Sequence, residues 1–104
     1  MSRTAKRLCK GTLGTANATL YTVPASTTST IISVILANKT AVDATVTLKF
    51  ASTEIMYLHT IAANDTLILD LKNSPPIIET AELIEGLSGT ATAINYYITG
   101  VEEV

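Results

Sequence analysis

The sequence predicts an all-β protein, an antiparallel β-sandwich or jelly-roll-like fold with seven to eight short strands. Runs rich in Val, Ile, Thr and Tyr, which are the residues that favour strands, recur along the chain. Clusters of Pro, Gly, Asn, Asp and Ser separate these runs at intervals of about 8–12 residues, as in all-β sandwiches. Only Thr80–Glu85 (TAELIE) has local helix character, and so short a segment is marginal as a helix, so we expect a turn or a short strand there.

The chain begins with a basic segment that we expect to lie apart from the sandwich. Met1–Lys10 is polar and basic, and the two glycines of Gly11–Gly14 (GTLG) predict a hinge or turn. We therefore divide the 104 residues into an extended N-terminal arm with its hinge, residues 1–14, and a single β-sandwich domain, residues 15–104.

The first two strands differ in character. Thr19–Val23 is a strand candidate that ends at Pro24, which has no N–H to donate to a β-ladder. Thr30–Asn38 (TIISVILAN) is apolar on both faces, which predicts a central strand or one covered by a partner. Strict alternation puts one set of side chains on each face: Ile32, Val34 and Leu36 on the first, and Ile31, Ser33, Ile35 and Ala37 on the second.

The later strands complete the predicted sandwich. Ala44–Ala51 alternates cleanly, with Val46, Leu48 and Phe50 predicted to point inward and Thr45, Thr47 and Lys49 outward. The remaining candidates are Glu54–Ile61, Thr66–Leu71, a short strand at most at Ile77–Ile78, and Thr92–Val101.

The composition indicates an uncharged surface. Charged residues make up 15% of the chain, against about 25% in an average protein, and 18 threonines supply much of the polar surface. A surface with few charges resists neither self-association nor docking. An assembly component and an ordinary small β-domain with a threonine-rich exterior both fit this composition.

Positive charge is concentrated at the start of the chain. Arg3, Lys6, Arg7 and Lys10 lie in the first ten residues with no acid among them, whereas residues 11–104 hold three basic residues and all nine acids. A basic arm on an acidic body can bind nucleic acid, a negative protein surface or another copy of the body. The acidic body makes a nucleic-acid protein the least favoured of these, so we expect the arm to bind a protein partner.

The sequence supplies few groups for catalysis or ligand binding. Cys9 and His59 are the only cysteine and the only histidine, so no internal disulfide forms. A Cys9–His59 pair is conceivable as the centre of a small hydrolase, but Cys9 lies in the basic arm, a poor place to hold a nucleophile. No metal-ligand cluster, phosphate loop or cofactor motif is present, so we expect no enzyme, no metal and no cofactor.

Targeting signals are also absent from the sequence. Met1–Lys10 lacks the apolar segment of a secretory signal peptide, and the longest uncharged run, Gly11–Asn38, is interrupted by Pro24 and a Ser/Thr cluster. We expect no membrane span and a protein made in a reducing cytoplasm.

Several apolar side chains lie opposite the predicted inward-facing sets. We expect Ile31, Ile35, Ile68 and Tyr97 to form an apolar interface, because clustered exposed apolar residues usually mark contact between proteins. An exposed Tyr97 or Tyr57 beside polar groups would instead suit a glycan-binding module, on a phage fibre or a bacterial adhesin.

The chain resembles small structural proteins of tailed bacteriophages between Thr19 and Glu102. The residues that carry the resemblance are Leu20–Ala25 (LYTVPA), the apolar strand ending in Ala37-Asn38, Ala44–Leu48 (ATVTL), Ile61–Leu67 (IAANDTL) and Gly100–Glu102 (GVE). The resemblance implies a virion protein that adds in many copies to the capsid exterior as a decoration protein, or to the head–tail neck, tail or fibre. Its partners would be copies of itself and the major capsid or neck and tail proteins. The family pattern has no catalytic residues, and it does not include the basic arm.

Overall fold

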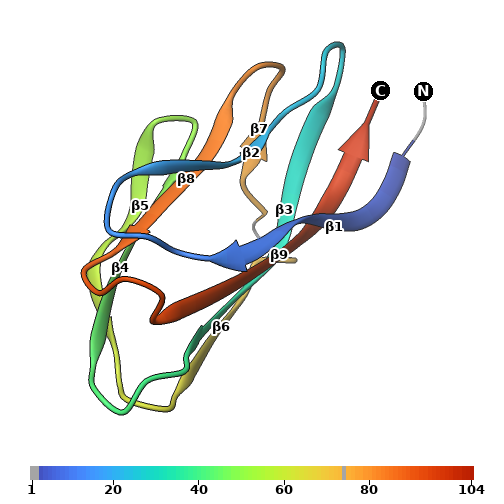
Figure 1. The fold of residues 1–104 in the computed structure, drawn as a ribbon. Coiled ribbons are helices and arrows are strands. Elements are labelled where there is room, and N and C mark those ends of the chain that lie inside the picture. The colour runs from blue at the N-terminus through green and yellow to red at the C-terminus, as the bar shows by residue number, and fades with distance from the viewer. Residues whose placement is uncertain (1–2, 74) are drawn as a thin grey trace.

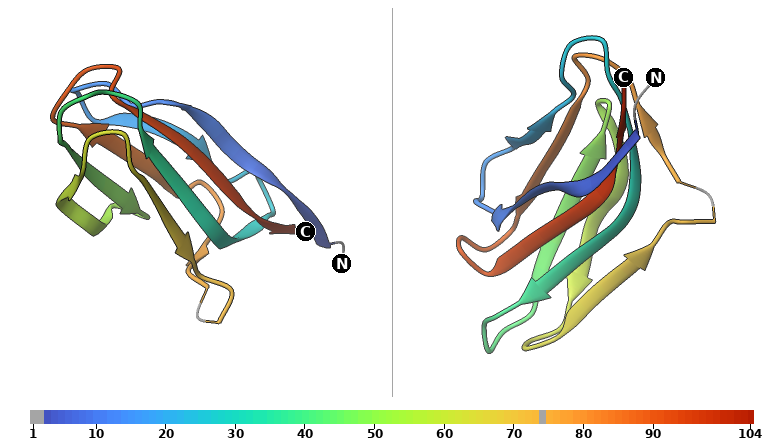
Figure 2. Two further views of the ribbon diagram at one scale, coloured as in Figure 1. Left: turned by 90° about the horizontal axis from the view of Figure 1, so that it is seen from below. Right: turned by 90° about the vertical axis from the view of Figure 1, so that its right-hand side faces the viewer.

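The chain folds into two antiparallel sheets packed face to face, which confirms the predicted all-β sandwich. A computed structural model describes residues 3–73 and 75–104, with only the backbone of Arg3 and Thr4. The strands form a five-stranded and a four-stranded sheet with a jelly-roll-like order, seen as two layers in Figures 1 and 2. Within these residues no helix is present, and hence none that is long and apolar enough to cross a membrane.

The first sheet has the strand order β1-β9-β3-β6, and the second has the order β2-β8-β4-β5. A short ninth strand, β7, pairs with β3 beyond the end of β6. The first sheet contains β1 (Arg3–Thr12), β9 (Ile94–Glu103), β3 (Thr28–Asn38), β6 (Thr66–Asp70) and β7 (Ile77–Ile78). The second contains β2 (Ala18–Thr22), β8 (Leu83–Ser88), β4 (Ala44–Phe50) and β5 (Thr53–Ile61).

The core between the sheets is almost entirely aliphatic. On β4 the predicted inward set, Val46, Leu48 and Phe50, is buried. Thr47 is buried as well, although alternation predicts that it points outward. The pairing of β4 with β5 is irregular at this point, and the Thr47 hydroxyl accepts a hydrogen bond from the Leu58 backbone N–H at 3.2 Å. The irregular edge strand therefore folds over a position that strict alternation would leave exposed.

A β-bulge in β3 changes which residues face the core. Ile31 and Ser33 pair with adjacent residues of β9, Gly100 and Thr99, so Ile32 is an extra residue in the ladder. One extra residue reverses the alternation of the strand from that point. Ile31 therefore joins Val34 and Leu36 on the inner face with 0% exposure. The prediction of Ile31 as an interface residue is wrong, because strict alternation takes no account of the bulge.

Gly100 allows the close approach of strands at this bulge. A Cβ atom on Gly100 would lie 2.2 Å from the carbonyl oxygen of Thr30 and 2.8 Å from Cδ1 of Leu8. Such distances are far below van der Waals contact, so any larger residue would displace the backbone of β3. The absence of a side chain at this position is thus a requirement of the packing between β9, β3 and β1.

The segment predicted as a separate arm is a strand of the first sheet. Residues Arg3–Thr12 form β1, which pairs antiparallel with β9 from Arg3 opposite Glu103 to Thr12 opposite Asn95. Its side chains reach the core, since Leu8 is buried and Cys9 packs against the buried residues. This differs from the expected division at residue 14. An edge strand buries only part of one face. The basic residues at its exposed positions therefore hide the alternating pattern by which a strand is recognised in the sequence.

Candidate interaction surface

The outer face of the first sheet carries the apolar residues that the sequence singles out. Tyr97 on β9 pairs with Lys10 on β1 and with Ile35 on β3, which pairs in turn with Ile68 on β6. Directly paired residues point to the same side of a sheet, so these four side chains form one row across all four strands. The structure thus brings together Ile35, Ile68 and Tyr97, three of the four residues predicted as an apolar interface.

This row, which we call the apolar row (Lys10, Tyr97, Ile35 and Ile68), is substantially open to solvent. Ile68 is 64% exposed and Tyr97 is 41% exposed, whereas Ile35 is half-buried between them. Ile77 on β7, which is 63% exposed, adds a further apolar side chain to the same face opposite Thr30. Exposed apolar residues that cluster in this way usually mark a contact with another molecule.

The basic residues of β1 divide between the two faces of the sheet. Arg7 pairs with Thr99 and Lys10 with Tyr97, both on the outer face. The guanidinium carbon of Arg7 lies 6.0 Å from the centre of the Tyr97 ring, within the range of a cation–π contact. Arg3 pairs through its backbone with Glu103, but its side chain lies outside the described residues. Arg7 therefore lies beside the apolar row, and Lys10 forms the β1 end of that row.

Lys6 is engaged within the chain. Its Nζ lies 3.3 Å from Oε1 of Glu102. The other carboxylate oxygen of Glu102 accepts a hydrogen bond from the Tyr21 hydroxyl, which also bonds to the Ser29 hydroxyl at 2.8 Å. Burial, together with the hydrogen bond to Glu102, raises the pKa of Tyr21 to about 12. The Tyr21 hydroxyl on β2 therefore links the second sheet to Glu102 and Ser29 of the first, while Lys6 pairs with Glu102 within the first sheet.

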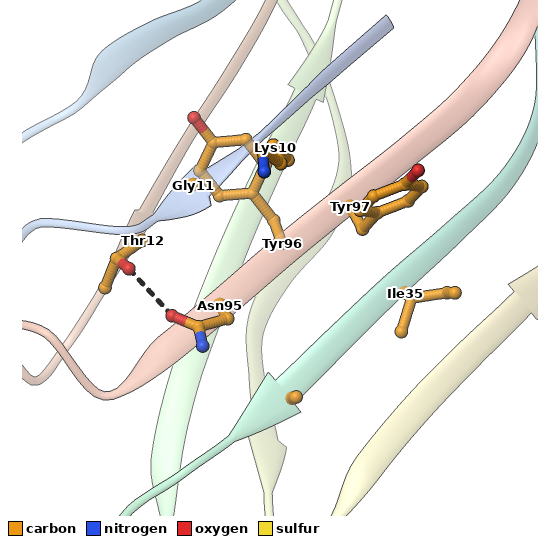
Figure 3. Close-up of a pocket in the computed structure, with 8 residues that line it drawn as sticks. Lys10, Gly11, Thr12, Ile35, Asn95, Tyr96 and Tyr97 are labelled. Carbon is orange, nitrogen blue, oxygen red and sulfur yellow. Dashed lines mark hydrogen bonds between the residues drawn. The ribbon is translucent and has the colours of Figure 1, made fainter. Parts of the chain in front are cut away.

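A shallow recess lies next to the apolar row, between β1 and β3 (Figure 3). Its volume is about 410 Å³. Residues from three strands line it: Lys10, Gly11, Thr12, Ile35, Ala37, Asn95, Tyr96 and Tyr97. Gly11 has no side chain to fill the recess. A Cβ atom at this position would lie 2.8 Å from the Tyr96 hydroxyl oxygen. The Thr12 hydroxyl donates to Oδ1 of Asn95 at 2.7 Å, which fixes two polar side chains at one end.

Cys9 and His59 do not form a catalytic pair. Cys9 lies on β1 at the edge of the first sheet, and His59 lies on β5 at the edge of the second. Strand β1 neighbours β2 across the sandwich, so β5 is at the opposite side of the molecule. Burial raises the pKa of the Cys9 thiol to about 12, which disfavours the reactive thiolate. Among the described residues no three His, Cys, Asp or Glu side chains gather as a metal site.

A second group of exposed apolar side chains lies on β5 and is largely missed by the sequence analysis. Ile55, Tyr57 and Leu58 are 45%, 67% and 54% exposed. Two irregularities interrupt the pairing of β5 with β4, and Leu58 has a positive φ of 49°. The sequence signal is the lack of clean alternation in Glu54–Ile61, which predicts an irregular strand but not which of its side chains leave the core.

Comparisons with known proteins identify the fold and not a family. No family model and no curated protein matches the chain. One solved structure with a similar fold carries the description "Bacillus endospore appendages form a novel family of disulfide-linked pili". The TM-score is 0.57 and the sequence identity is 14%, with 99% of this chain and 88% of the other covered. At this identity the likeness concerns the arrangement of strands, and it extends over the whole of this chain, β1 included.

Proposed function

We propose that this chain is a non-enzymatic structural subunit that works in many copies within a larger protein assembly. The observation that carries the proposal is the apolar row, three of whose residues form an exposed or half-exposed apolar strip across the outer face of the first sheet. The basic side chains of Arg7 and Lys10 flank the strip on β1. The similarity in fold to a pilus protein supports a structural role, since it covers 99% of this chain.

The assembly that we propose is the virion of a tailed phage, with the chain decorating or cementing the capsid exterior. The support is the resemblance of residues 19–102 to small phage structural proteins. The partners would be the major capsid protein and further copies of this chain. The head–tail neck, the tail and the fibre are the other places that the resemblance allows, and a pilus-like filament is the alternative that the fold comparison suggests.

We propose further that the subunits associate without covalent links. Cys9 is the only cysteine of the chain, and it packs against the core, half-buried, with a thiol pKa raised to about 12. A thiol in this state forms disulfides slowly, because the thiolate is the reacting species. We expect native assemblies to stay intact in a reducing agent at neutral pH, and dissociation under reduction would contradict this part of the proposal.

The proposal is tested by locating the protein in cells or lysates that carry its gene. Antibodies against the purified chain, with gold labels, are applied to particles separated by density and viewed by electron microscopy. We expect regularly spaced labels on the outside of phage heads. Labels on the neck, tail or fibres would correct the location, and labels on filaments would replace the virion by a pilus. Protein that sediments as a free monomer with no labelled particle would overturn the structural role.

Glycan binding is a second candidate function that the recess favours. An aromatic ring, Tyr97, lies beside the polar groups of Lys10, Thr12 and Asn95, which is the combination that sugars require of a binding site. A glycan array probed with the wild-type protein, with Tyr97→Ala and with Tyr57→Ala tests it. Binding that Tyr97→Ala abolishes and Tyr57→Ala preserves would support this function, because Tyr57 lies on the other sheet. An array without signal would remove the candidate.

A further inference from the structure

The first sheet ends in two open edges. In the part of the chain that the structure describes, β1 pairs only with β9, and β6 pairs only with β3. The backbone N–H and C=O groups on the far side of each strand are therefore available to another strand. The ladder between β3 and β6 runs from Ser33–Asp70 to Ala37–Thr66 without a register shift. A regular edge of this kind is a template for adding a strand from a second molecule.

The edges of the second sheet are less suited to such pairing. Strand β5 has two irregularities in its ladder and a positive φ at Leu58, so its outer edge is not a straight row of donors and acceptors. Strand β2 contains a register shift within its five residues and is followed closely by Pro24, whereas β6, of the same length, pairs without a shift. Strand β1 also has one register shift, between Arg7 and Cys9, but it pairs without interruption from Arg3 to Arg7 and again from Cys9 to Thr12. Neither β5 nor β2 has an uninterrupted stretch of that length, so we exclude both strands as the main contact.

The directions of the strands allow the first sheet to continue from one copy to the next. β1 is antiparallel to β9, β9 to β3 and β3 to β6, so direction alternates across the sheet. A second copy placed beside the first in the same orientation brings its β6 against β1. Because β1 and β6 run in opposite directions within one copy, β6 of the second copy is antiparallel to β1 of the first. All strands of the combined sheet are then antiparallel to their neighbours.

The side chains at the two edges are complementary in this arrangement. On the outer face, the row next to the apolar row begins with Arg7 on β1 and ends with Asp70 on β6. The Asp70 carboxylate also lies 3.6 Å from Nζ of Lys72, but both side chains are exposed, and such a pair contributes little, so Arg7 of a second copy can replace Lys72 as its partner. Continuing the rows into a second copy places its Asp70 beside Arg7, and its exposed Ile68 beside the stem of Lys10. Pairing two β1 edges instead would bring the basic side chains Arg7 and Lys10 of the two copies close to one another, which is repulsive.

We propose that copies of this chain associate head to tail, with β6 of one copy adding antiparallel to β1 of the next. The contact pairs Asp70 with Arg7, covers Ile68 with Lys10 and joins the two first sheets into one. Because the two edges differ, the contact is heterologous and generates a ring or an open filament rather than a closed two-fold dimer. The proposal rests on the multi-copy structural role proposed above and specifies its contact.

The first test is a charge exchange between the two edges, read as molar mass against concentration by light scattering. We expect Arg7→Glu with Lys10→Glu to weaken association by about tenfold or more, and Asp70→Lys to do the same, because each variant presents like charges at both edges. Mixing the two variants, or combining all three substitutions in one chain, restores opposite charges and should restore association. Lys39→Glu, an exposed loop change of the same sign, is the matched control.

The second test is cross-linking between the paired rows. Thr12 and Thr66 are the ends of one row, on opposite edges of the sheet, so they are distant within a copy and adjacent across the proposed junction. In a Cys9→Ser chain, Thr12→Cys with Thr66→Cys should give a ladder of disulfide-linked oligomers under oxidation. Thr12→Cys with Thr53→Cys, which places one thiol on the β5 edge, should not.

The outcomes separate this inference from the proposed function. If the wild type associates and the charge variants associate equally well, the contact between β1 and β6 is wrong and the structural role still stands. If the wild type stays monomeric and the Thr12–Thr66 pair forms no ladder, the edges do not pair and the inference is overturned. The structural role is then decided by the labelling of native particles, which does not depend on which surface makes the contact.

Discussion

The two sheets expose apolar side chains in different ways. On the first sheet, Ile68 and Tyr97 lie in a row where the pairing of β9, β3 and β6 is uninterrupted, with Arg7 at one edge of the sheet and Asp70 at the other. On the second, Ile55, Tyr57 and Leu58 lie on an edge strand whose ladder is interrupted twice. The amount of exposed apolar surface does not separate the two regions. The difference is that the first sheet also offers a regular backbone at its β6 edge and complementary charges at its two edges, which a strand partner needs.

The largest expected effect comes from breaking the first sheet itself. Gly100→Ala places a Cβ 2.2 Å from the Thr30 carbonyl oxygen, so the ladder between β9 and β3 must shift. We expect a loss of about 1–3 kcal/mol in the free energy of unfolding, as for other overpacked positions. Urea denaturation measures it, with Gly14→Ala as the control because no heavy atom outside its two chain neighbours lies within 4 Å of its added Cβ. Equal stability of the two variants would show that the first sheet tolerates distortion.

The next test compares the two exposed apolar regions directly. Ile68→Lys places a charge at the proposed junction beside Lys10 of the neighbouring copy, and we expect association to weaken by about tenfold. Ile55→Lys makes the same chemical change on β5, and we expect association as in the wild type. Ile68 and Ile55 are 64% and 45% exposed, so both variants should fold normally. A stronger effect of Ile55→Lys in sedimentation measurements would assign the contact to the second sheet.

The smallest expected effect is a change of stability with pH that arises from Cys9 on β1 and Tyr21 on β2. The pKa values of Cys9 and Tyr21 rise from 9.0 and 10.0 to about 12 in the folded chain, in both cases chiefly through burial. The folded state holds these protons more tightly, so the stability contribution is complete below pH 9 and is lost as the pH rises toward 12. We expect the free energy of unfolding to fall over this range.

A double variant identifies the groups responsible for this pH dependence. Cys9→Ala with Tyr21→Phe removes both titrating groups while keeping the aromatic ring of residue 21. Its unfolding free energy should therefore fall less steeply between pH 9 and 12 than that of the wild type. Thermal unfolding followed at several pH values provides the comparison, and parallel curves for the two proteins would contradict the assignment.

Much of the fold can be predicted from the sequence because alternation reports burial wherever a ladder is regular. Val46, Leu48 and Phe50 on β4 illustrate this, since their predicted inward positions are confirmed. Alternation fails at the bulges: Ile32 reverses the faces of β3 and moves Ile31 into the core, and the irregular pairing of β5 buries Thr47. A bulge depends on the partner strand as well as on local residues, so the residue pattern of one strand does not reveal it.

The candidate surface can be predicted only in part, for a related reason. Ile35, Ile68 and Tyr97 stand out in the sequence because each lies opposite an inward-facing set. Their gathering into one row depends on the order β9-β3-β6, which joins segments far apart in the chain. β1 is missed as a strand because its charges suggest a free arm, although its backbone pairs with β9 from Asn95 to Glu103.

The even number of strands in the row β1-β9-β3-β6 has a consequence for growth. With an even number, identical orientation of successive subunits keeps neighbouring strands antiparallel, so every subunit points the same way. An open assembly built on this rule has a polarity, with β1 unpaired at one end and β6 at the other. Addition at the two ends is then chemically distinct and can proceed at different rates. A partner that pairs with the unpaired β1, or one that pairs with the unpaired β6, would therefore stop the addition of subunits at that end only.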